Sequence, residues 1–425
     1  MMMKSDYSHI PVRTPDLLLP KDGTDMQAWA TVACDQYTSQ PDYWNRVEAQ
    51  AEGKPSTYHL MLPELYLEEA DVDERIAVIN RTMESYLENG AFKVLPETMM
   101  LVRRKTKYAP LRTGLVMAFD LEAYDFRKGS GSLIRATEGT VTERIPPRMK
   151  IRKDAAIEMP HIMILIDDPS CTVIENLSAA IEKRGFAPEY DFDLMEEGGH
   201  IEGYAVSDSD LIDGVMNGLA GLASPEAFCK KYGVPANTPV LLFAVGDGNH
   251  SLASAKCHYE ENPNPKARYA LAELINVHDA GIIFEPIHRV LFGAEASAFL
   301  AELQAYFGDR VILGEGNGHV IPYIFGTERG VFTIDKSVHT LAVGALQEFI
   351  DVYLSRHPEA KVDYIHGDDT VAELAAGGNM GFILPAMDKN DLFKTVILNG
   401  ALPRKTFSMG EACEKRFYLE CREIR

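Results

Sequence analysis

The sequence lacks the features that mark membrane proteins, secreted proteins and cysteine-based sites. It contains no run of about 18 apolar residues, so we expect no transmembrane helix. Residues 1–20 have no continuous apolar stretch of the kind found in secretory signals. Six cysteines are present but none forms a Cys-x-x-Cys pair, which argues against a zinc site and a disulfide framework. We therefore expect a cytoplasmic protein with reduced cysteines and no membrane partner.

Positive charge is also scarce. The 425 residues include 42 lysines and arginines against 63 aspartates and glutamates, which gives a formal net charge of −21. Sequence-independent binding to DNA or RNA depends on neutralising phosphates with basic side chains, so we expect no nucleic-acid partner. A local basic site for a small anion remains compatible with this charge. Oligomeric state is left open by the sequence.

The order of apolar patterns predicts an α/β or α+β fold, with mixed sheets and flanking helices. Helices are expected at residues 73–89, 176–184, 210–223, 251–261, 341–354 and 370–376. Strands are expected at residues 99–105, 113–124, 161–166, 240–245, 320–325, 330–334, 362–365 and 381–384. Residues 187–199 are acidic and are expected to form a surface loop. The length suggests three regions with approximate boundaries, 1–130, 131–295 and 296–425, which could also form one intertwined unit.

The best candidate site is the segment Val245-Gly246-Asp247-Gly248-Asn249-His250-Ser251. It joins an apolar strand to a helix, and the first turn of a helix has unpaired N–H groups and a partial positive charge. Glycine lets the backbone approach an anion closely. His250 can donate to a phosphate oxygen, and Asp247 can hold a metal or a substrate hydroxyl. The alternative is a tight turn in which Asp247 or Asn249 caps the helix.

Basic residues gather just before this segment. Between Arg135 and Lys153, six basic residues, among them Arg144 and Arg148, stand against two acids, Glu138 and Glu143. Pro146 and Pro147 favour a loop there rather than a helix. The window could supply positive charge to a phosphate site, or it could be a solvated basic loop that pairs with surface acids.

Two later segments carry further cations. Arg289 lies in Phe284-Glu-Pro-Ile-His-Arg, and Arg404 and Lys405 lie in Pro403-Arg-Lys-Thr-Phe-Ser. Each segment is a candidate part of a phosphate site. For the second segment a solvent-facing turn is an equal alternative.

The chain resembles the family called domain of unknown function 1015. The resemblance rests on five stretches: 33–41 (ACDQYTSQP), 135–140 (RATEGT) with the arginines that follow, 243–253 (FAVGDGNHSLA), 284–289 (FEPIHR) and 402–410 (LPRKTFSMG). It spans nearly the whole chain. The family resemblance alone implies no particular chemistry.

A second resemblance concerns the loop. The strand–Asp-Gly-x-His–helix element is similar to the phosphate-binding box of the partition-protein and sulfiredoxin superfamily, which includes a free serine kinase. That resemblance implies binding of ATP or ADP, and the family context implies a role in serine metabolism. Phosphoryl transfer from such a nucleotide would also need Mg²⁺. The chain departs from the superfamily pattern at Ser251, where an arginine usually provides a bidentate phosphate ligand.

These observations favour a small-molecule phosphotransferase that acts on free serine or a similar hydroxy compound. Glu138, Asp247 and His250 are the candidate catalytic residues, with Asp247 also the candidate Mg²⁺ ligand. The candidate phosphate ligands are Gly246, Gly248, Asn249, Ser251, Arg135, Arg144, Arg148, Arg289, Arg404 and Lys405. The alternative is a non-catalytic protein that senses a nucleotide or another phosphorylated metabolite.

Overall fold

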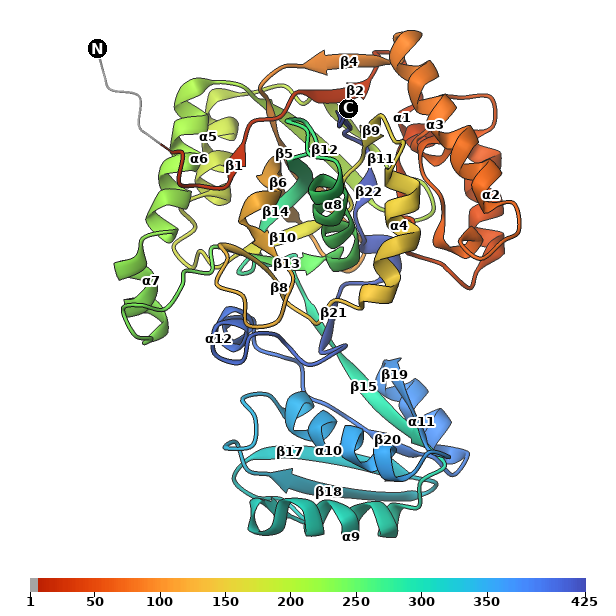
Figure 1. Cartoon of the computed structure of the whole chain (residues 1–425), viewed down its shortest axis with the longest axis vertical. Coiled ribbons are helices and arrows are strands. Elements are labelled where there is room, and N and C mark those ends of the chain that lie inside the picture. The colour runs from red at the N-terminus through yellow and green to blue at the C-terminus, as the bar shows by residue number, and fades with distance from the viewer. Residues whose placement is uncertain (1–6) are drawn as a thin grey trace. The chain divides into compact units, whose positions relative to one another are not determined.

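The chain folds into two compact units, which the computed structural model describes for residues 7–425 (Figure 1). The first unit contains the chain up to Ile282 and also the C-terminal segment Gly410–Arg425. The second unit is Ile283–Met409, inserted in the sequence between these two parts. Within the described residues, no helix is long and apolar enough to cross a membrane.

This division differs from the three regions expected from the sequence. Strand β14 (Tyr269–Asn276) of the expected central region pairs along its length with β6 (Arg112–Asp120) of the expected N-terminal region. A boundary near residue 130 would therefore cut a continuous sheet. The last 16 residues of the chain, 410–425, return to the first unit, which length and composition cannot indicate.

A mixed sheet of ten strands within the described residues forms the centre of the first unit. Besides β6 and β14, its strands are β1 (Val12–Arg13), β5 (Met99–Lys105), β7 (Tyr124–Asp125), β8 (Ile134–Ala136), β10 (Met163–Ile166), β11 (Tyr190–Asp193), β12 (His200–Val206) and β13 (Phe243–Asp247). The order is β11-β12-β5-β6-β14-β10-β13-β8-β7, and β1 also pairs with β6. The pairs β10–β14, β13–β8 and β7–β8 are parallel, and the other pairs are antiparallel. The mixed α/β class expected from the sequence is confirmed.

Both faces of this sheet are buried, because neighbouring side chains of a strand point to opposite faces. In β5, Met99 and Leu101 belong to one core, and Met100 and Val102 belong to the other. The first core is completed by α5 (Ile174–Arg184), α6 (Ser209–Leu222) and α8 (Asn249–Glu261). The second is completed by α1 (Met26–Trp29), α2 (Pro41–Ala51), α3 (Val72–Glu88) and the C-terminal segment. The first unit also contains α4 (Ile145–Arg152) and α7 (Pro225–Tyr232).

The C-terminal segment is tied into the first unit by short strand pairs and buried ion pairs. Its strands β22 (Phe417–Tyr418) and β23 (Arg422–Glu423) pair with β3 (Thr31–Val32) and β9 (Ile157–Glu158), while β2 (Leu17–Pro20) pairs with β4 (Phe92–Leu95). Arg416 Nε lies 3.2 Å from Glu273 Oε2 with both side chains 1% exposed, and Arg416 also pairs with Glu420. Removing one partner of such a pair leaves an uncompensated buried charge, so the segment is an integral part of this unit.

The second unit is built on an antiparallel sheet of seven strands within the described residues. Its order is β16-β18-β17-β20-β15-β19, with β21 paired to β15. The strands are β15 (Phe284–Phe292), β16 (Val311–Ile312), β17 (His319–Phe325), β18 (Glu328–Ile334), β19 (Lys361–His366), β20 (Met380–Phe382) and β21 (Phe407–Met409). The helices are α9 (Ala296–Phe307), α10 (Ala342–Arg356), α11 (Asp368–Ala376) and α12 (Lys389–Asn399).

Two local expectations are wrong. Within residues 187–199, expected to be a loop, Tyr190–Asp193 form edge strand β11, which pairs with β12 through alternating buried and exposed positions. The basic window forms helix α4 despite its two prolines, because they lie in the first turn, where the missing N–H groups have no partner inside the helix. Short 3₁₀ helices occupy Thr57–Leu60, Glu64–Tyr66, Leu121–Ala123, Thr142–Arg144, Gly308–Arg310 and Ala412–Glu414.

Candidate functional site

The candidate loop is a tight connection between β13 and α8. Phe243, Ala244 and Val245 of β13 are fully buried, which fixes the end of the strand in the core. Gly248 follows with a φ of +80°, and a β-carbon there would lie 3.0 Å from Ile162 Cγ1, so glycine is required. Gly248 is the N-cap, and no side chain caps α8. The alternative in which Asp247 or Asn249 is the N-cap is therefore wrong, although the Asp247 side chain accepts from the Gly248 amide at this end of the helix.

Asp247 points to the C-terminal segment. Its Oδ2 atom lies 3.0 Å from Nζ of Lys415, and its Oδ1 atom accepts a hydrogen bond from the Gly248 amide. Burial alone would favour the neutral carboxyl, but the Lys415 ammonium outweighs it and lowers the pKa of Asp247 below its ordinary value. Asp247 is therefore ionised and Lys415 places a second charge beside the loop.

The segment between β8 and α4 runs beside the loop and is attached at two points. The Thr137 hydroxyl donates to the Val245 carbonyl at 2.7 Å, and the Val141 amide donates to Nε2 of His250 at 3.2 Å. Glu138, between these two points, is half-buried. Because His250 accepts at Nε2, a neutral ring carries its proton on Nδ1.

Two buried oxygens of this region have no hydrogen-bond partner within residues 7–425. They are Oγ1 of Thr140 and Oδ1 of Asn249. A buried polar atom without a partner costs about 1–3 kcal/mol, so such atoms usually meet a ligand or water. An amide oxygen accepts hydrogen bonds from hydroxyl and amino groups, and a hydroxyl both donates and accepts. Both atoms are therefore candidates to meet a ligand or a water molecule.

His161 precedes β10 and connects α8 to the C-terminal segment. Its Nε2 atom lies 2.8 Å from Oγ of Ser251, and its Nδ1 atom lies 2.7 Å from the Tyr418 hydroxyl. The Cys34 amide donates to the Tyr418 oxygen at 3.3 Å. Burial raises the pKa of the Cys34 thiol to about 12 and that of the Tyr418 phenol well above its ordinary value, so both groups stay protonated.

The arginines expected to supply phosphate ligands have different surroundings. Arg135 donates to the carbonyls of Ser132, Pro239 and Val240, so it supports the turn that leads into β13. Burial lowers the pKa of Arg135. Arg144 is exposed, and Arg148 pairs with Glu64, whose amide donates to the Cys34 carbonyl at 2.8 Å. Of these three, Arg148 is the one connected to the Tyr418–His161–Ser251 contacts.

Three further expected cations belong to the second unit. Arg289 is buried and donates to Gln347 Oε1 at 2.9 Å and to the carbonyls of Ile287 and Arg404. Arg404 and Lys405 are exposed. Arg289 therefore organises the second unit internally, and a phosphate role for the three stays a prediction.

Metal binding at the loop is not favoured by the residues present. Within residues 7–425, no group of three or more histidine, cysteine or acidic side chains is arranged to hold a metal ion. Asp247 faces an ammonium group at 3.0 Å. Mg²⁺ prefers several oxygen ligands, so this carboxylate does not by itself form a Mg²⁺ site. We assign no chemical step to a metal.

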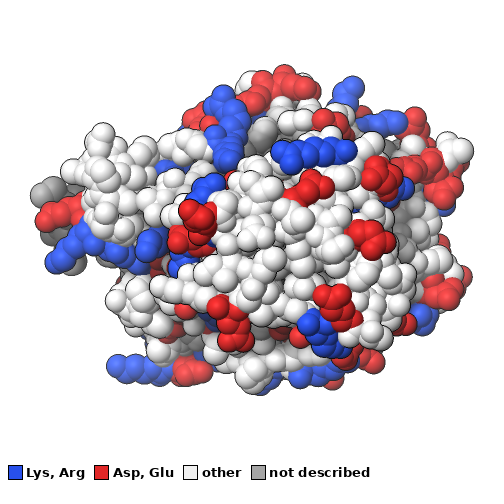
Figure 2. All heavy atoms as spheres, turned by 90° about the horizontal axis from the view of Figure 1, so that it is seen from below, with Lys and Arg blue, Asp and Glu red and all other residues white. Residues whose placement is uncertain are grey.

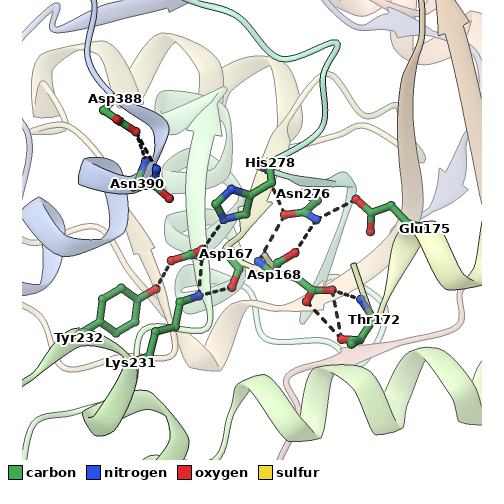
Figure 3. A network of polar contacts seen from close by, with 10 residues as sticks. All are labelled: Asp167, Asp168, Thr172, Glu175, Lys231, Tyr232, Asn276, His278, Asp388 and Asn390. Carbon is green, nitrogen blue, oxygen red and sulfur yellow. Dashed lines mark hydrogen bonds and ion pairs between the residues drawn. The ribbon is translucent and has the colours of Figure 1, made fainter. Parts of the chain in front are cut away.

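A second polar cluster lies where the parallel strands β10 and β14 end (Figure 3). Asp167 accepts from Tyr232 at 2.5 Å and pairs with Lys231 at 2.8 Å and His278 at 2.7 Å. Asp168 accepts from the amides of Thr172 and Val173, just before α5, and Asn276 donates to the Asp168 carbonyl at 2.8 Å. Carboxyl ends of parallel strands often bind ligands. Here the polar groups bind one another and attach α5 and α7 to the sheet.

A cavity of about 160 Å³ lies elsewhere in the first unit. It is lined by Leu19–Thr24, Met26, Lys93, Glu189 and Tyr190, none of which belongs to the loop. Lys93 bridges Asp22 at 2.8 Å and Glu189 at 3.0 Å, so its charge is already balanced. This cavity therefore adds no cation to the candidate site.

Sequence reasoning missed Lys415, His161, Tyr418 and Thr140. His161 offered a weak signal, because it stands at the start of an apolar strand. Thr140 lies inside the basic window, where charge is the more visible signal. Lys415 and Tyr418 gave no local signal, since they reach the loop through the folding back of the C-terminal segment.

Together the fold and site define a mixed α/β protein with a glycine loop and an uncapped helix N-terminus. The chain belongs to the family described as protein of unknown function (DUF1015), whose model matches residues 18–372. None of the curated proteins compared with the chain matches it.

Several solved structures show a distant likeness. A free serine kinase variant in complex with ADP has 10% identity and a TM-score of 0.39, over 74% of this chain and 94% of that chain. A conserved hypothetical protein from Pyrococcus furiosus has 11% identity and a TM-score of 0.37, over 73% and 95%. SbnI from Staphylococcus aureus, truncated at its C-terminus, has 10% identity and a TM-score of 0.36, over 69% and 83%. Similarity at this level says nothing about the ligand of this chain.

Proposed function

We propose that the chain is a small-molecule phosphotransferase that binds the phosphates of ATP or ADP at Gly246–Ser251 and transfers phosphate to a hydroxy compound such as free serine. The observation that carries the proposal is the uncapped N-terminus of α8 beside the Lys415 ammonium. Backbone N–H groups and a nearby cation are the groups that a phosphate needs.

Phosphoryl transfer depends mainly on positioning and on charge stabilisation. In this proposal the first-turn amides of α8 and Lys415 bind the phosphates. Asn249 and Thr140 provide the buried oxygens that orient a hydroxyl or amino group of the ligand. Glu138, on the segment held by Thr137 and Val141, orients the acceptor hydroxyl.

One observation favours a second candidate, a protein that senses a nucleotide without turning it over. The Asp247 carboxylate, which would hold Mg²⁺ in a transferase, is paired with Lys415. A site without a resident metal can bind a phosphate through amides and ammonium alone. Turnover of nucleotide in the presence of serine separates the two candidates.

The test is a thermal-shift screen of nucleotides with and without Mg²⁺, followed by calorimetry and a coupled turnover assay. ATP or ADP is expected to raise the melting temperature. Gly248→Ala is expected to abolish the shift, because its positive φ and its contact with Ile162 both oppose a β-carbon. Gly233→Ala is the matched control, since Gly233 has a φ of +66° at the end of α7 with open space around it. Equal loss of binding in both variants, or no shift with any nucleotide, would contradict the proposal.

A further inference from the structure

A chain of hydrogen bonds joins three side chains from distant parts of the first unit. Ser251 stands in the first turn of α8, His161 before β10, and Tyr418 in the C-terminal segment. The Ser251–His161 and His161–Tyr418 distances are 2.8 and 2.7 Å. A hydroxyl bonded to one imidazole nitrogen, with an oxygen bonded to the other, is the arrangement that activates a serine.

The surroundings of Tyr418 favour one donor-to-acceptor direction along the Ser251–His161–Tyr418 hydrogen bonds. The Tyr418 oxygen accepts from the Cys34 amide, and its hydroxyl interacts with the buried Cys34 thiol. The phenol oxygen can then accept a hydrogen bond from the Nδ1–H group of His161 as well. In that tautomer Nε2 of His161 carries the lone pair and accepts the Ser251 hydroxyl proton.

The loop supplies what such a serine needs during reaction. The loop also carries Asp247, whose pKa is lowered by the Lys415 ammonium and further by the charge of His161. The uncapped first turn of α8 stabilises negative charge that forms on a group attached to Ser251. Ser251 and His161 are both half-buried, so they keep contact with the surface.

We propose that Ser251 is a catalytic nucleophile and that His161 is its base. The natural phosphoryl donor rests on the proposed function above. Ser251 Oγ attacks the phosphorus of the donor, forming an Oγ–P bond, while the bond from phosphorus to the leaving oxygen breaks and its electron pair departs with the leaving nucleotide. The Ser251 proton moves to Nε2 of His161. His161 returns it to Oγ when the phosphoryl group passes to the acceptor hydroxyl, whose own proton goes to the carboxylate of Glu138, the acceptor base of the proposed function.

The test uses the full chain and diisopropyl fluorophosphate, an electrophile that requires no nucleotide site. Ser251 Oγ displaces fluoride from phosphorus, and peptide mapping by mass spectrometry locates the adduct. We expect an adduct at Ser251 that is absent from Ser251→Ala. His161→Gln should slow its formation by about 10²–10⁴-fold, the usual contribution of a general base. Circular dichroism confirms that each variant is folded.

Ser254→Ala is the matched control. Ser254 lies on the same helix, but its buried hydroxyl donates to the His250 carbonyl at 2.7 Å instead of to a histidine ring. This variant should react like the unchanged protein. No adduct at Ser251 in the folded protein, or an unchanged rate in a folded His161→Gln, overturns the proposal.

A second arm separates this inference from the proposed function. The chain is incubated with ATP and Mg²⁺, and phosphate on Ser251 is sought by mass spectrometry. Nucleotide turnover without any modification of Ser251 by either reagent overturns the nucleophile and leaves the transferase standing. A His161-dependent adduct in a chain that binds no nucleotide supports the nucleophile and contradicts the transferase.

Discussion

Nζ of Lys415 lies 3.0 Å from Oδ2 of Asp247, although the two residues are 168 positions apart in the sequence. The pair joins the C-terminal segment to the end of β13, where the glycine loop begins. It therefore connects the last part of the chain with the candidate phosphate site.

Lys415→Met is expected to weaken nucleotide binding by about 1.5–3 kcal/mol, because a charged hydrogen-bond donor to phosphate is lost. The pKa of Asp247 should also rise, since the ammonium that lowers it is gone. Isothermal calorimetry measures the affinity. Lys266→Met is the control, because Lys266 pairs with exposed Glu423 at 2.6 Å. Equal affinity in both variants would limit Lys415 to a structural partner of Asp247.

His250→Ala is expected to release the segment that carries Glu138, because the Val141 amide loses its acceptor. Hydrogen exchange across residues 137–141, followed by mass spectrometry, should become faster. If His250 also contacts phosphate through Nδ1, nucleotide affinity falls by about 1.5–3 kcal/mol. Unchanged exchange together with unchanged affinity would remove both roles from His250.

Glu138→Gln is expected to lower turnover, whereas His250→Ala is expected to lower nucleotide affinity. Glu138 is proposed to act on the acceptor hydroxyl, so nucleotide affinity should stay nearly the same while turnover falls by about 10²–10⁴-fold. Calorimetry and a coupled assay measure the two quantities separately. Equal damage to binding from both substitutions would argue against Glu138 as the acceptor base. No turnover by the unchanged protein with any hydroxy amino acid would favour the sensor.

Glu158 is expected to contribute to the pH dependence of the free energy of unfolding at acid pH. It is buried and accepts from Arg422 at 2.6 Å and from Arg152 at 2.6 Å. Burial alone would raise its pKa, but these two guanidinium groups outweigh burial and lower the pKa below its ordinary value. Its contribution is therefore fully present above the unfolded pKa of about 4.3 and is lost as pH falls through the lower folded pKa.

Urea unfolding at a series of pH values measures this contribution. Glu158→Gln should reduce the free energy of unfolding at neutral pH by about 3–5 kcal/mol, because two arginines lose a buried counter-charge. Its stability should also depend less on pH in the acid range than that of the unchanged protein. Glu423→Gln, in an exposed pair, is the control. Parallel acid curves for all three proteins would contradict the assignment.

The chain is expected not to bind duplex DNA at physiological salt, because its net charge of −21 repels phosphates. On the face shown in Figure 2, basic side chains lie among acidic ones and do not form a continuous stripe. A gel-shift titration at several salt concentrations is the measurement. Micromolar binding that weakens with salt would contradict this prediction.

Local periodicity predicted six of the twelve helices of the described residues, α3, α5, α6, α8, α10 and α11, and placed their ends within two residues. The expected helix at 73–89 is α3 at Val72–Glu88, because Ile76, Ile79 and Met83 repeat at helical spacing and are buried. The expected helix at 251–261 begins two residues earlier, at Asn249, because Gly248 can cap it. Edge strand β11 was missed because its outward positions are acidic, so the strand has the composition of a loop.

The candidate site was only partly predictable for a different reason. The strand, the glycine loop and the helix are contiguous, so the sequence showed them together. His161 approaches the loop because of the order of the strands in the sheet, and Lys415 and Tyr418 approach it because the C-terminal segment folds back onto the first unit. Neither of these arrangements leaves a local pattern in the sequence. Arg135 was expected to bind phosphate because of its charge, yet its donors are taken by backbone carbonyls.

The return of residues 410–425 to the first unit also has a consequence for how that unit folds. Asp247 and Glu273 pair with Lys415 and Arg416, which lie beyond the whole inserted second unit in the sequence. Closing so long a loop costs chain entropy before the contact is gained, so pairs of this kind form slowly. The candidate site therefore depends on contacts of the slowest-forming class in the fold.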